Sequence, residues 1–82
     1  MQEGAGQKAV QAAVEALEGT LAVARALVGA GRVVDLAGLD QDAARVCAAA
    51  MALPPAEGRA LLPALEAVAR QIDALAGSIG PP

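Results

Sequence analysis

The chain has 82 residues, a formal net charge of −3 and a pI near 4.6, which limits it to one small domain. Its six lysines and arginines are scattered and it has no aromatic residue, so binding to nucleic acid is not expected. The longest charge-free run, residues 46–56, is too short for the roughly 20 residues of a membrane-spanning helix, so no membrane association is expected either.

Alanine dominates the apolar composition. Of the residues that make up the 56% apolar fraction, half are alanines, which bury little surface. A fully buried leucine or valine contributes roughly 1.5 to 3 kcal/mol, whereas ordering one residue costs about 1.5 kcal/mol. This balance is close to zero, so we expect the fold to be helped by self-association or by a partner protein.

The first predicted element is an amphipathic helix over residues 7–28, where large apolar residues alternate at steps of four and three. Residues 1–6 lack this pattern, so we expect them to be flexible, and we do not expect them to act as an export signal. Gly19 is either a point of close helix packing or a tolerated surface glycine, and the second interpretation is favoured. The apolar stripe consists of Val10, Val14, Leu17, Leu21, Ala24 and Val28.

Gly29 or Gly31 is expected to end this helix in the left-handed conformation. A phosphate-binding glycine loop is excluded, because such a loop opens a helix and its third glycine would stand at Val34. The connector over residues 32–39 is unusually apolar and is expected to pack against the helices. The residues expected to do so are Val33, Val34, Leu36 and Leu39.

A short middle helix is predicted over residues 41–53, with Asp40 as its N-cap and Asp42 in its first turn. The prolines at positions 54 and 55 end it. Its expected buried residues are Ala43, Val46, Cys47, Ala50 and Leu53, with Met51 at the edge.

The third helix is predicted over residues 55–78, with Pro55 in the first turn and Glu57 two residues later. Pro63 either kinks this helix or separates a short first turn from it, and one kinked helix is favoured. A surface pair of Glu66 with Arg70 is expected. Residues 80–82 are expected to be flexible. The helix repeats the four-three spacing with Leu61, Leu65, Val68, Ile72, Leu75 and Ile79.

No pattern of chemistry-bearing residues indicates catalysis. There is no histidine to act as a base or a metal ligand. Cys47 is expected to be buried, with no base nearby in the sequence to activate it. Asp40 and Asp42 resemble the start of a calcium loop, but its later oxygen ligands are missing. We therefore expect no enzyme activity, no cofactor and no metal.

The predicted fold is all-α, with a long antiparallel hairpin of helices 7–28 and 55–78 and the short middle helix laid across it. Residues 7–79 would form one domain. We expect a cytoplasmic protein-interaction module that binds a partner helix, either a second copy in a homodimer or a client protein. The candidate interface residues are Leu61, Leu65, Val68, Ile72, Leu75, Ile79, Val10, Val14, Leu17 and Leu21.

In class and helix arrangement the chain also resembles bacterial flagellar and type III secretion chaperones of the FlgN and FliT type. That resemblance implies binding of an export client. A third alternative is a regulatory domain that holds a small ligand between its helices.

Overall fold

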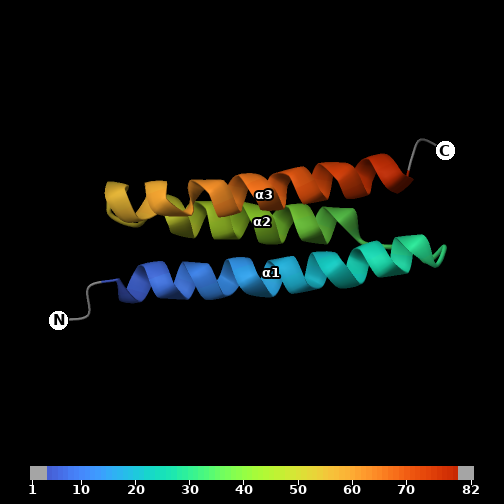
Figure 1. Ribbon diagram of the computed structural model, residues 1–82, viewed down its shortest axis with the longest axis horizontal. Helices are drawn as coiled ribbons and strands as arrows, with labels where there is room; N and C mark the ends of the chain where they lie inside the picture. The colour runs from blue at the N-terminus through green and yellow to red at the C-terminus, as the bar shows by residue number, and fades with distance from the viewer. Residues whose placement is uncertain (1–3, 80–82) are drawn as a thin grey trace.

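A computed structural model describes residues 4–79, which form three helices packed against one another in an elongated bundle of 50 × 18 × 17 Å (Figure 1). The helices are α1 (Ala5–Gly29), α2 (Leu36–Met51) and α3 (Pro55–Ile79). The predicted all-α, three-helix class is therefore confirmed. Of the segments predicted to be flexible, residues 1–3 and 80–82 lie outside the described part of the chain, whereas Ala5 and Gly6 already belong to α1.

The direction of the helices differs from the prediction. Helices α1 and α3 run parallel, and α2 runs antiparallel to both and alongside them rather than across them (Figure 1). The side-chain amide of Gln7 donates to the carbonyl of Glu57 at 3.3 Å, so the first turns of α1 and α3 lie side by side. The predicted antiparallel hairpin is wrong because residues 30–35 and residues 52–54 each reverse the chain, and two reversals restore the original direction.

The parallel direction places the two apolar stripes level with each other. Each residue of the α3 stripe follows its α1 counterpart by 51 positions, and the Gln7–Glu57 hydrogen bond joins residues 50 positions apart. Apolar side chains of both stripes therefore lie in one core along the bundle. The stripe residues in or packed on that core are Val10, Val14, Leu17, Leu21, Ala24 and Val28 from α1 and Leu61, Leu65, Val68, Ile72 and Leu75 from α3, whereas Ile79 is 46% exposed.

Gly31 ends α1 with a Schellman motif, which decides between the two predicted glycines. Its φ is +77°, and its N–H donates to the carbonyl of Val28 at 3.0 Å. The N–H of Arg32 donates to the carbonyl of Leu27 at 2.8 Å. Both bonds satisfy carbonyls that a helix end otherwise leaves unpaired. Gly29 is the last residue of the helix itself.

Helix α2 begins at Leu36, five residues earlier than predicted. Its N-cap is Asp35, whose carboxylate accepts from the N–H of Gly38 at 3.0 Å, so the prediction of Asp40 as N-cap is wrong. Leu36 and Leu39 belong to the first turns of α2 and pack on or in the core. This explains most of the apolar character of residues 32–39.

Two side chains in and after this region also differ from the prediction. Val33 is 96% exposed rather than packed, whereas Val34 is partly buried against the core. At its other end α2 stops at Met51, and Leu53 lies in the turn that follows, partly buried. The predicted helix end at residue 53 is therefore two residues too late.

Helix α3 is continuous through Pro63, so the predicted single helix is confirmed. Proline has no N–H, and the carbonyl of Arg59 consequently lacks its helical partner. Both residues lie on the exposed side of the helix, where water can hydrogen bond to that carbonyl. The predicted pair of Glu66 with Arg70 is not formed: within residues 4–79 the ion pair present is Arg45 with Asp42, at 2.9 Å.

The close-packing glycine of the fold is Gly58, not Gly19. A Cβ atom at Gly58 would lie 3.0 Å from the backbone oxygen of Ala50, so α2 and α3 approach closely at this point. A Cβ atom at Gly19 would meet nothing within 4 Å. The interpretation of Gly19 as a surface glycine is therefore confirmed.

The cap assignment predicts the effect of two aspartate substitutions. Asp35→Ala should lower the free energy of unfolding by about 1 kcal/mol, because the N–H of Gly38 loses its acceptor. Asp40→Ala, inside the helix, should change it by no more than about 0.5 kcal/mol. Urea unfolding followed by circular dichroism at 222 nm measures both. A larger loss for Asp40→Ala would contradict the observed start of α2.

The two glycines predict opposite changes in stability. Gly19→Ala should raise the free energy of unfolding by about 0.5 to 1 kcal/mol, because alanine favours the helix and the site is open. Gly58→Ala should lower it, since its Cβ would press on a backbone carbonyl. The same urea titration applies. Equal stabilisation by both substitutions would show that α2 and α3 are not in close contact at Ala50.

Candidate functional site

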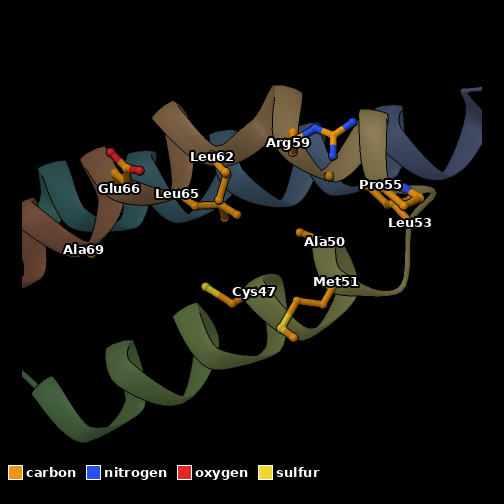
Figure 2. Close-up of a pocket in the computed structure, with 11 residues that line it drawn as sticks. Cys47, Ala50, Met51, Leu53, Pro55, Arg59, Leu62, Leu65, Glu66 and Ala69 are labelled. Atoms are coloured by element: carbon orange, nitrogen blue, oxygen red, sulfur yellow. The ribbon is translucent and has the colours of Figure 1, made fainter.

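An open groove of about 600 Å³ lies between α2 and α3 (Figure 2). Leu62 and Leu65 project from α3 toward α2, and Cys47 projects from α2 toward α3. We call this feature the α2–α3 groove. Its lining residues are Cys47, Ala50, Met51, Leu53, Pro55, Gly58, Arg59, Leu62, Leu65, Glu66 and Ala69.

Small side chains on α2, Cys47 and Ala50, form part of the groove wall. The helices touch where Ala50 meets Gly58, and Figure 2 shows α2 separating from α3 away from that end. Beyond the contact, the α2 wall carries Cys47, whose short side chain does not reach across the space. An apolar channel is therefore left open along the bundle rather than filled by the chain itself.

Two large apolar side chains at the groove are exposed to solvent. Met51 is 86% exposed and Leu62 is 47% exposed. Arg59 and Glu66 supply the charged groups of the lining, and both are exposed. The groove thus offers apolar contact along its length with one positive and one negative charge on its α3 side. Such a surface suits an amphipathic partner.

A second, smaller hollow of about 310 Å³ lies between the end of α1 and the start of α2. It includes the exposed side chains of Val23, Leu27 and Val33. Its walls also contain the carboxylates of Asp35 and Asp42, of which one caps α2 and the other pairs with Arg45. The α2–α3 groove is larger, and its charged groups form no ion pair within residues 4–79.

The predicted interface is used inside the chain. Its residues lie in the core between the helices, except that Leu65 is only partly buried and Ile79 is 46% exposed. While the chain keeps this fold, the buried ones are unavailable to a partner, because the α1 and α3 stripes cover each other and α2 covers both. The buried residues of that prediction are Val10, Val14, Leu17, Leu21, Leu61, Val68, Ile72 and Leu75.

The exposed groove residues were missed by the sequence reasoning. Leu62 belongs to a second stripe on α3 that has the same four-three spacing as the core stripe but alternates apolar, charged and small residues. Only that spacing could have indicated a second contact face. The stripe consists of Pro55, Arg59, Leu62, Glu66, Ala69 and Asp73.

Cys47 is exposed, which corrects the prediction that it packs in the core. It lies next to buried Val46 on α2, and the core side of the helix is centred on Val46 and Ala50 instead. Within residues 4–79 no three of the histidine, cysteine, aspartate and glutamate side chains are grouped so that they could hold a metal ion. None of the helices in that range is long and apolar enough to cross a membrane.

Comparison of the chain with known protein families, with curated proteins and with solved structures gives no significant match.

The neighbouring leucines of α3 provide a test of the site's geometry. Leu61→Ala should lower the free energy of unfolding by about 2 to 5 kcal/mol, because Leu61 is 3% exposed and its loss leaves a core cavity. Leu62→Ala should lower it by less than about 1 kcal/mol, since Leu62 already contacts solvent. Urea unfolding at several protein concentrations compares them, and the values at the lowest concentration, where any self-association contributes least, decide. Similar losses from both would place Leu62 in the core instead of at the groove.

Proposed function

We propose that the protein is a small, non-catalytic interaction module that binds a helix of a protein partner in the α2–α3 groove. The observation that carries this proposal is the open apolar groove with exposed Met51 and Leu62, in a chain whose other stripes are already buried against each other. An amphipathic helix presents apolar residues at intervals of three and four, which suits a channel lying along two helices.

The favourable free energy of binding would come mainly from burying apolar surface. Each Å² of apolar groove surface that a partner removes from water contributes roughly 25 cal/mol of favourable free energy. The same burial would help a core that contains no aromatic side chain and many alanines. Binding and folding stability would therefore rise together, since a ligand that binds only the folded state stabilises it.

Two related functions use the same groove. In an export chaperone of the flagellar or type III secretion kind, the bound helix would belong to a client polypeptide. The exposed free thiol of Cys47 is compatible with the reducing cytoplasm, where such a client would be held. In a regulatory domain the occupant would be a small molecule, and the groove volume falls within the roughly 300 to 1,000 Å³ of ligand pockets. A polypeptide is favoured because the charged groups lie along α3 rather than converging on one point.

Site-specific photo-crosslinking in the expressing cell tests the proposal. A photoreactive amino acid replaces Leu62 or Met51 in the groove, and a matched control replaces Ala12, on the exposed face of α1. We expect crosslinked polypeptide at the two groove positions in several-fold excess over Ala12. Mass spectrometry of the product identifies a second copy or another chain. Crosslinking no stronger than at Ala12, with a small molecule retained in native mass spectrometry, would favour the regulatory domain and contradict the proposal.

A further inference from the structure

We propose that the partner in the α2–α3 groove is a second copy of this chain, related by a two-fold axis that passes close to Leu62. The two α3 helices would lie antiparallel, and each copy would insert Leu62 into the groove of the other. This inference rests on the proposed function of the groove. It names a second copy of the chain as the occupant of the groove, because the charge pattern of α3 fits that occupant.

The charge pattern on the exposed face of α3 is complementary to itself when reversed. Arg59 precedes Leu62 by three residues and Glu66 follows it by four, so all three lie on one face of the helix. Arg59 and Glu66 are seven residues apart, about 10.5 Å along the axis. In an antiparallel pair centred midway between residues 62 and 63, Arg59 of each copy lies level with Glu66 of the other. Two equivalent ion pairs form, as a two-fold interface requires.

Neither charge is already used within the described chain. The ion pair found in residues 4–79 joins Arg45 to Asp42, and Arg59 and Glu66 are both exposed. A parallel second copy would instead place Arg59 beside Arg59 and Glu66 beside Glu66. Like charges in contact disfavour that arrangement. The pattern therefore selects the antiparallel direction.

The extent of the groove points to the same centre. On α3 its lining runs from Pro55 to Ala69, and the midpoint of that range is Leu62. An axis half a residue farther along, midway between residues 62 and 63, places Ala69 of one copy level with Ala56 of the other, and both residues are exposed alanines. Small side chains at these positions allow the two helices to approach closely. The midpoints of the groove lining on α3 and of the charge pair thus lie within half a residue of each other, and both charged residues belong to the lining.

The test is sedimentation velocity of the full chain with a set of charge reversals. The wild-type protein should sediment at twice its mass of 8.0 kDa at micromolar concentration. Arg59→Glu or Glu66→Arg should each weaken dimerisation by about tenfold or more, because each turns two attractive pairs into two repulsive ones. The double reversal restores both pairs and should return the dissociation constant to within about threefold of wild type.

Matched controls separate this pairing from net charge and from folding. Arg25→Glu and Glu15→Arg make the same changes of charge on exposed positions of α1 and should leave the dimer unchanged. Circular dichroism at 222 nm should report equal helix content in all variants. Leu62→Asp should give a folded monomer.

Two results would overturn the inference. One is a helical wild-type monomer at about 100 μM, well above the micromolar range of specific association. The other is a double reversal that remains as weak as the single ones. If crosslinking at Leu62 then captures a different polypeptide, the second copy is rejected while the groove keeps its proposed function. If it captures none, both proposals fail.

Discussion

The structure depends on the parallel seam between α1 and α3. The apolar stripes of these two long helices, offset by 51 positions in the sequence, contribute most of the buried residues of one core that runs along the bundle. Leu21 and Leu75 are its most completely buried members. Because parallel helices cannot be joined by a short turn, α2 must carry the chain back. Its position against both helices follows from that connection and from the apolar residues it adds, Leu39, Val46 and Ala50.

Small side chains explain both the close contacts and the groove. Where Ala50 meets Gly58 the backbones of α2 and α3 approach until no Cβ atom fits easily between them. Farther along, the same shortage of large side chains leaves the space beside Cys47 unfilled. A chain that builds its helices mostly from alanine gains helix propensity and loses buried area. The exposed groove is the surface where a second polypeptide could supply what the single chain lacks.

The helices themselves were predictable, because four-three spacing determines which face of a helix is apolar whatever it packs against. Pro55 and Gly31 also mark ends by local backbone chemistry alone. Helix direction was not predictable from spacing, since one stripe fits a parallel or an antiparallel partner equally well. Both Asp35 and Asp40 are residues that can cap a helix, and the sequence does not show which of them does. The hydrogen bond from the N–H of Gly38 to the carboxylate of Asp35 identifies Asp35 as the N-cap. Cys47 and Leu62 each follow a buried core residue in the sequence. A step of one residue turns a side chain by about 100° around the helix axis, which is enough to move it from the core to the surface.

Because the chain runs along the bundle three times, its first and last described turns, near Gly4 and Ile79, lie at opposite ends of a bundle 50 Å long (Figure 1). Most compact domains keep their ends close together. Here, any polypeptide joined ahead of α1 and any joined after α3 would be held apart by the full length of the bundle. Copies of this bundle linked in tandem would therefore extend in a line instead of folding back on themselves.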